Sequence, residues 1–406
     1  MEKDSLLFEL SVNEDDAKEV KDHFEDNGYK GLKELLVKKR DQWVDVPIHV
    51  ALSGTLGAGK SSFINNIRGI KADDKIGAAL NYGQTTIEPI PYSHPNKHYL
   101  KFWDLPQLGS RAFTKDLYFK NIKADRYDYF LIFGKSTFTE DDFWFASQLY
   151  SLNKKFYFVC THVDICVEKA LEENKKSDPR DVQNKTLNTI REGLAKSVKD
   201  AKIKADYIYL ITTSDVRKYD GPRLADAMIG DLSERKWEAM ALTIHVYAKG
   251  VMQQKRRALQ KRVWIIALMS GLENACHIYG LSFYLDLEPV IAEVQEYRRQ
   301  FGLDDASILK IARSLDTTVE SLKKASAFKT NYSQLADGGL LNQYKTLSVY
   351  DVADGITQSF SPILGGLISG NSSFGSTYYV LNRLLDMMET DALRMIEYVK
   401  YRSAEL

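Results

Sequence analysis

The chain has 406 residues, 44% of them hydrophobic and 27% charged, a balance typical of a globular protein with two or three domains. Lysine plus arginine equals aspartate plus glutamate at 55 each, so charge alone gives no reason to expect a nucleic-acid partner. The three cysteines have neither disulfide-framework nor metal-site spacing, and the first residues do not form a signal-peptide pattern. We therefore expect a cytoplasmic protein that is not secreted.

The first part of the chain predicts a helical segment followed by a phosphate-binding loop. Apolar residues recur at helical spacing within residues 1–46, and residues 48–52 then alternate as in a strand. Residues 54–61 read GTLGAGKS and match the pattern G-x-x-x-x-G-K-[ST], with helical spacing after them. A strand, a glycine loop and a helix N-terminus together direct backbone N–H groups at phosphate oxygens. The residues expected to bind phosphate are Gly54, Gly57, Ala58, Gly59, Lys60 and Ser61.

The last residue of this loop and two later positions predict a magnesium site. The Ser61 hydroxyl is one expected ligand, and Thr86, with Thr85 as the alternative, would complete the oxygen shell from a first switch. Asp104 ends the predicted strand 99–103 and would hold Mg²⁺ through water. Asp104 begins a D-x-x-G-like run in which Gln107 replaces the glycine whose N–H meets the γ-phosphate.

A base-recognition site is predicted at the ends of two further strands. Residues 154–160 form an apolar run that leads into Thr161-His162-Val163-Asp164, a variant of the [NT]-K-x-D pattern. A carboxylate at Asp164 would accept the N1–H and 2-amino groups of guanine, which disfavours an ATPase or kinase, and the His162 imidazole would stack on the purine. After the predicted strand 207–211, the backbone N–H groups of Thr212, Thr213 and Ser214 would meet the guanine O6.

Composition divides the chain into an N-terminal helical segment (1–46), a nucleotide domain (47–235) and a C-terminal helical domain (236–406). Within the last, residues 355–382 carry no charge and are rich in glycine and serine. A membrane-inserting hairpin and a buried glycine-rich helix both fit that pattern, and we favour the buried helix.

Local sequence runs identify a family resemblance over nearly the whole chain. They include SSFIN at 61–65, YSHP at 92–95, WDLP at 103–106, KFYFV at 155–159 and FGLDDAS at 301–307. The set resembles the immunity-related GTPases, the interferon-inducible p47 type. The resemblance implies a Ras-like P-loop domain with a helical domain built from both chain ends, and it adds Ser62 to the phosphate site. It also implies GTP, GDP and Mg²⁺ binding, nucleotide-dependent self-assembly, peripheral association with intracellular membranes and a role in cell-autonomous innate defence.

The departures from the family concern hydrolysis and anchoring. A switch glutamate used in activation aligns with Gln84, Leu108 follows Gln107 where a water-positioning glutamine is usual, and Glu2 rules out the N-myristoylation seen in some members. Candidate catalytic residues are therefore Lys60, Gln84 and Gln107. Because transition-state groups in Ras-like enzymes contribute ~10³–10⁵ in rate, we expect slow GTP hydrolysis. The alternative is a weak or inactive nucleotide-binding scaffold that acts through its helical domain.

Overall fold

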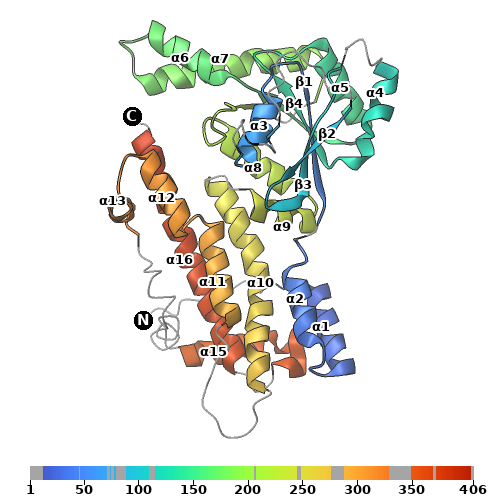
Figure 1. Ribbon diagram of the computed structural model, residues 1–406, viewed down its shortest axis with the longest axis vertical. Coiled ribbons are helices and arrows are strands. Elements are labelled where there is room, and N and C mark those ends of the chain that lie inside the picture. The colour runs from blue at the N-terminus through green and yellow to red at the C-terminus, as the bar shows by residue number, and fades with distance from the viewer. Residues whose placement is uncertain are drawn as a thin grey trace. The chain divides into compact units, whose positions relative to one another are not determined.

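The computed structural model describes residues 12–44, 46–70, 74, 77–78, 88–108, 115–204, 207–244, 248–275, 288–328, 349–368 and 372–403. The chain divides into two compact units, one of residues 44–251 and the other of residues 1–43 together with 252–406 (Figure 1). The first unit is built on a sheet, whereas the described elements of the second are helices. This arrangement confirms the predicted α/β domain and the predicted helical domain that both ends of the chain build.

A six-stranded sheet forms the centre of the first unit. Its strands are β1 (Ile48–Gly54), β2 (Ile90–His94), β3 (Lys97–Asp104), β4 (Tyr129–Gly134), β5 (Lys155–Cys160) and β6 (Ile208–Leu210). The order is β2-β3-β1-β4-β5-β6, and all neighbours are parallel except the β2–β3 pair. No strand was predicted at 90–94, because this segment contains Pro91 and its side chains do not alternate between buried and exposed positions. An edge position tolerates that proline, since no further strand needs its missing N–H.

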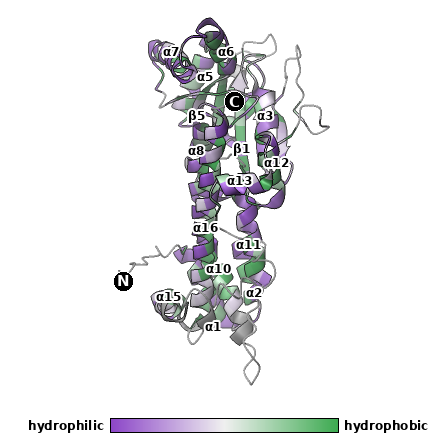
Figure 2. Cartoon of the chain, turned by 90° about the vertical axis from the view of Figure 1, so that its left-hand side faces the viewer, coloured by the Kyte–Doolittle hydropathy of each residue, from purple (hydrophilic) through white to green (hydrophobic). Residues whose placement is uncertain are grey.

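Helices surround this sheet. They are α3 (Lys60–Ile67), α4 (Lys115–Ile122), α5 (Glu140–Ser151), α6 (Val163–Glu173), α7 (Pro179–Asp200), α8 (Gly221–Gly230) and α9 (Glu234–Thr243), with a 3₁₀ turn η1 (Ala124–Arg126). Phe130, Ile132 and Phe158 are fully buried against helix residues such as Phe145. By contrast α7 is mostly hydrophilic in Figure 2 and buries only Val182, Leu194 and Val198, as in a helix with one face in solvent.

Helix α9 belongs to the sheet unit, whose end at residue 251 lies beyond the residue 235 expected from composition. Two polar contacts attach the helix. The Tyr99 hydroxyl on β3 lies 2.7 Å from the Thr243 hydroxyl, and Lys236 forms an ion pair with Asp128 just before β4. Composition does not reveal such contacts, because they join residues far apart in the sequence.

The helical unit combines both ends of the chain. Its helices are α1 (Glu14–Asn27), α2 (Leu32–Arg40), α10 (Lys249–Ala275), α11 (Glu288–Gln300), α12 (Asp305–Ser314), α13 (Val319–Ala325), α15 (Val349–Leu364) and α16 (Ser372–Ser403), with a 3₁₀ turn η3 (Gly365–Leu367). Helix α1 packs against α15, and α16 packs against α11 and α15. The Arg262 guanidinium of α10 lies 5.9 Å from the Trp43 ring centroid and forms a buried ion pair with Glu293 of α11.

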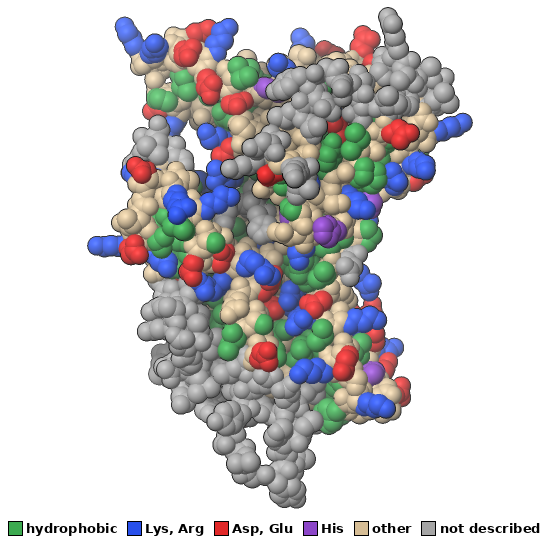
Figure 3. All heavy atoms as spheres, viewed as in Figure 1, with side chains coloured by type: hydrophobic (Ala, Val, Ile, Leu, Met, Phe, Trp, Pro, Cys, Tyr) green, Lys and Arg blue, Asp and Glu red, His purple; other side chains and the backbone are tan. Residues whose placement is uncertain are grey.

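The uncharged stretch 355–382 packs inside the helical unit where the structure describes it. The Phe360 ring contacts the rings of Phe374 and Tyr378, and all three side chains are buried. A Cβ at Gly375 would lie 2.1 Å from the Ala353 carbonyl oxygen, so this glycine permits close contact between α15 and α16. Among the described residues, no helix combines the length and the apolar character needed to cross a membrane. Figure 3 shows basic and acidic side chains interspersed over the visible face.

Candidate nucleotide-binding site

The carboxyl ends of the parallel strands place the predicted site residues at one edge of the sheet. Strand β1 ends at Gly54, β3 at Asp104, β5 at Cys160 and β6 at Leu210. In doubly wound sheets of this kind, ligands bind outside this edge. The phosphate loop, the buried aspartate, the T-x-x-D segment and the loop after β6 therefore all follow strands that open onto the same edge.

Backbone geometry explains two glycines of the phosphate loop. Gly54 has φ +135°, and a Cβ there would lie 2.1 Å from the Phe133 carbonyl oxygen on β4. Gly59 has φ +86°, and a Cβ would lie 2.9 Å from the Thr213 methyl group. Side chains at either position would push the loop away from its neighbours. The first intrahelical bond runs from Phe63 N to Gly59 O, so the N–H groups of the preceding turn are directed outward for an anion.

Lys60, Ser61 and Ser62 form the first turn of α3. The Lys60 ammonium donates to the carbonyl oxygens of Gly54 at 2.9 Å and Thr55 at 3.3 Å. Burial lowers the pKa of Lys60, while the carboxylates of Asp104 and Asp142 oppose that shift. The ammonium therefore folds back onto the carbonyl groups of its own loop, where a bound phosphate would compensate its loss of hydration.

Asp104 is a buried carboxylate with one oxygen unpartnered among the described residues. Its exposed fraction is 8%, and no hydrogen bond reaches Oδ1. Burial raises the pKa of Asp104, and the Lys60 charge lowers it. An unsatisfied buried oxygen in a P-loop site fits the donor set of a magnesium shell, as does the Ser61 hydroxyl on the first turn of α3.

The segment after Asp104 begins in a fixed position. Leu105 N donates to Leu52 O at 2.9 Å, and the buried Tyr118 hydroxyl donates to Pro106 O at 2.7 Å. Gln107 is half-buried, and Leu108 is packed into the hydrophobic core with 8% exposure. Tyr118 was not a candidate from the sequence, because nothing in its local pattern signals a contact with residue 106. The predicted Gln84, Thr85 and Thr86 lie outside the described residues.

The segment predicted to recognise the base is hydrogen-bonded to the phosphate loop. Thr161 is fully buried, and its hydroxyl donates to Ala58 O at 2.9 Å. His162 adopts a left-handed conformation with φ +61° before α6, and burial lowers its pKa, which favours a neutral imidazole. Asp164 lies in the first turn of α6, where its Oδ2 accepts a hydrogen bond from the Thr212 hydroxyl at 2.6 Å.

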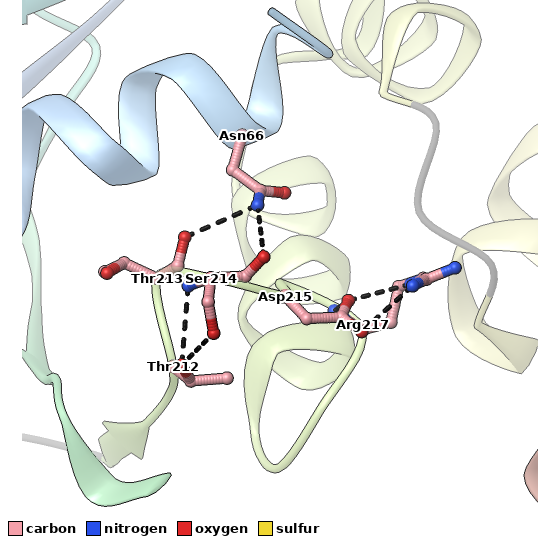
Figure 4. Close-up of polar contacts among 6 residues, drawn as sticks. All are labelled: Asn66, Thr212, Thr213, Ser214, Asp215 and Arg217. Atoms are coloured by element: carbon pink, nitrogen blue, oxygen red, sulfur yellow. Dashed lines mark hydrogen bonds and ion pairs between the residues drawn. The ribbon is translucent and has the colours of Figure 1, made fainter. Parts of the chain in front are cut away.

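A second link joins α3 to the loop after β6. The Asn66 side chain reaches the backbone carbonyls of Thr213 and Ser214, as Figure 4 shows. Asn66 was not a candidate from the sequence. The available signal was weak: two successive asparagines, of which Asn65 is buried, lie in the helix that follows the phosphate loop.

Taken with the strand order, the glycine loop and its lysine define a P-loop protein of the GTPase-like α/β class with an added helical domain. The sequence pattern of the family described as Interferon-inducible GTPase (IIGP) matches residues 17–399. The chain belongs to this family, which confirms the resemblance drawn from its motifs.

Curated relatives support the assignment over most of the chain. T-cell-specific guanine nucleotide triphosphate-binding protein 2 of Mus musculus is 27% identical over 387 residues, which cover 95% of this chain and 90% of that protein. Interferon-inducible GTPase 1 of Mus musculus is 30% identical over 362 residues, covering 88% and 83% respectively. A solved structure of Aquifex aeolicus Era bound to GDP.AlF4- is 17% identical with a TM-score of 0.29, covering 54% of this chain and 66% of that one. The family assignment does not depend on this last similarity.

Proposed function

We propose that the protein binds GTP and GDP in a Mg²⁺-dependent manner. The observation that carries the proposal is the hydrogen bond from Thr161 to Ala58, which ties the segment bearing Asp164 to the phosphate loop. Phosphate recognition would use the loop residues Gly54, Gly57, Ala58, Gly59, Lys60, Ser61 and Ser62. Base recognition would use Asp164, with His162 stacking on the purine and the backbone N–H groups of residues 212–214 meeting O6.

Residues fit for magnesium are Ser61, through its hydroxyl, and Asp104, whose Oδ1 is buried without a hydrogen bond among the described residues. Thr86 is the third proposed ligand. A bound Mg²⁺ would supply positive charge to the phosphate oxygens. The role of the chain itself is to hold Lys60 beside those oxygens and to keep the Asp104 carboxylate ionised near it.

We propose slow GTP hydrolysis. Lys60 would stabilise charge on the phosphates, and Gln84 and Gln107 occupy switch positions that usually carry other residues. The buried Leu108 side chain has no group that could orient a water molecule, which supports a low rate. The same observation favours a second function, a nucleotide-binding scaffold without turnover that acts through its helical domain.

Family membership supports the wider proposal. Self-assembly controlled by the bound nucleotide, peripheral association with intracellular membranes and cell-autonomous innate defence would be the consequences of GTP binding in the cytoplasm. The names of two relatives refer to interferon induction and to guanine nucleotides, which supports a nucleotide-controlled role in innate defence.

Calorimetric titration with GDP, GTP and ATP in the presence of Mg²⁺ tests nucleotide binding. Tight binding of GDP and GTP, weak binding of ATP and no binding of GDP to the Lys60→Ala variant are expected. Equal affinity for ATP and GTP would refute the role given to Asp164.

Single-turnover release of phosphate from bound GTP, at low and high protein concentration, separates the two candidate functions. Release that accelerates with concentration supports a self-assembling GTPase. Absence of release at both concentrations leaves the scaffold.

A further inference from the structure

The Asn66 side chain is a bridge between the helix that follows the phosphate loop and the loop that follows β6. Its Nδ2 donates to Ser214 O at 2.8 Å and to Thr213 O at 3.4 Å. Figure 4 shows the Asn66 amide pointing from α3 to these two successive carbonyls. A side-chain amide has two N–H donors on one nitrogen, so it can bond both carbonyls at once.

Holding two carbonyls fixes the direction of two peptide groups. In a planar trans peptide, the C=O of one residue and the N–H of the next point in opposite directions. Because the Thr213 and Ser214 carbonyls face Asn66, the N–H groups of Ser214 and Asp215 face away from it. The Ser214 N–H accordingly points to the Thr212 hydroxyl at 3.4 Å, and that hydroxyl donates to Asp164. The amide side of the loop therefore faces the carboxylate proposed to read the base.

Other contacts fix the remainder of this loop. Asp215 accepts hydrogen bonds from Arg217 N at 3.0 Å and Arg217 Nε at 2.7 Å, which closes the turn after Ser214. The methyl group of Thr213 lies against Gly59. The half-buried Asn66 is the described side chain that controls the carbonyl side of residues 213 and 214 from outside the loop.

We infer that Asn66 is a positioning residue that sets selectivity at the 6-position of the purine. Asn66 orients the N–H of Ser214, which is one of the groups proposed to meet O6, and the adjacent N–H of Asp215. With these donors directed at the base, the loop favours a strong acceptor such as a 6-oxo group over a weak one. The inference rests on the proposed binding of guanine nucleotides. It assigns Asn66 no contact with the nucleotide itself.

The test measures dissociation constants of the full chain for GDP, 6-thio-GDP and IDP. Replacing O6 by sulfur weakens the acceptor at the 6-position and keeps the N1–H and 2-amino groups, whereas IDP keeps O6 and lacks the 2-amino group. We expect the wild type to prefer GDP over 6-thio-GDP about five- to tenfold, as one or two net hydrogen bonds would give. In Asn66→Ala this preference falls to within about twofold, while the preference of GDP over IDP is kept.

Two further variants complete the design. Asn66→Asp has nearly the same size but no donors, so it should lose the 6-position preference at least as fully as Asn66→Ala. Asn184→Ala, at an exposed asparagine on α7, should leave both preferences unchanged. Thermal unfolding verifies that each variant is folded.

The outcomes distinguish this inference from the proposed function. A wild type that binds no GDP refutes guanine-nucleotide binding. A wild type that binds GDP and 6-thio-GDP equally, or Asn66 variants that keep the full preference, overturns the role of Asn66 alone. Parallel loss of both preferences in Asn66→Ala and Asn66→Asp also overturns it, because a general structural role would affect every contact of the base.

Discussion

The Thr161 hydroxyl donates to the Ala58 carbonyl oxygen over 2.9 Å, although 103 residues separate them in the chain. The same hydroxyl lies 3.3 Å from Gly134 O and 2.8 Å from His162 Nδ1. One fully buried side chain thus joins the phosphate loop, the end of β4 and the residue proposed to stack on the base. The segments proposed to recognise phosphate and base are therefore coupled through it.

Thr161→Val tests this coupling. Valine has the same shape but no hydroxyl, so the Ala58 carbonyl loses a buried partner and the free energy of unfolding should fall by about 1–3 kcal/mol. We expect GDP to bind about three- to tenfold more weakly, because the position of Asp164 relative to the loop is less well defined. Urea denaturation and calorimetry measure the two effects. Thr189→Val on α7 is the matched control, and an unchanged GDP affinity in Thr161→Val would contradict the coupling.

Asp104→Asn should separate stability from function. Burial raises the pKa of Asp104, so its ionised form destabilises the fold above that raised pKa. At pH 7 the Asp104→Asn variant should therefore have a free energy of unfolding about 1 kcal/mol higher than the wild type, measured by urea denaturation. This advantage should shrink as the pH falls through the raised pKa towards the ordinary value of about 3.9. The Mg²⁺ dependence of GTP binding should weaken at the same time. Asp200→Asn, at an exposed position, should change neither quantity. If Asp104→Asn is less stable than the wild type at pH 7, the ionised Asp104 carboxylate does not destabilise the fold.

Asp164→Asn should change which base is bound. The asparagine amide cannot accept both donors of guanine, so GDP affinity should drop by about 100-fold. Its N–H can donate to the 2-oxo group of xanthine, so the affinity for XDP should rise. Competition between GDP and XDP for a fluorescent nucleotide measures both changes. Because the amide oxygen of the variant can still accept from the Thr212 hydroxyl, we expect little loss of stability, and retention of GDP preference would exclude Asp164 from the base site.

The burial of Lys255 should make the stability of the helical unit depend on pH. This residue of α10 is fully buried, its ammonium lies 2.7 Å from Gln300 Oε1, and burial lowers its pKa to about 7. In the unfolded chain Lys255 stays protonated up to its ordinary pKa of about 10.4. The free energy of unfolding should therefore rise as the pH increases from ~7 to that value.

Lys255→Met should therefore increase the free energy of unfolding at pH 6 by about 1–3 kcal/mol, with the gain shrinking at pH 9. The gain is partial, since methionine leaves the buried Gln300 oxygen without this donor. Urea midpoints at both pH values measure it, and Lys310→Met at an exposed site provides the control. A gain that is the same at pH 6 and pH 9 would show that Lys255 keeps its ordinary pKa.

Much of the architecture could be predicted because its signals are local. The strand, loop and helix around residues 48–67 are contiguous, so their order and chemistry are visible in the sequence itself. In the strand that leads to Asp104 two aromatic residues precede the aspartate, and the strand before Asp164 is mostly apolar. Asp104 is the last residue of its strand, and Asp164 lies in the first turn of the helix that follows its strand. Edge strand β2 was missed because its side chains do not alternate between buried and exposed positions.

Sequence by itself determined the class of fold, the phosphate loop and the residues facing the sheet edge, because a backbone that cradles phosphate needs glycines, a lysine and a hydroxyl at fixed short spacing. Only the tertiary structure decided which groups connect them. The Asn66 bridge spans 148 residues to Ser214, the helical unit joins residues before 44 to those after 251, and the burial of Lys255 depends on the helices around it. Contacts of this kind depend on packing between distant segments, and no local spacing encodes them.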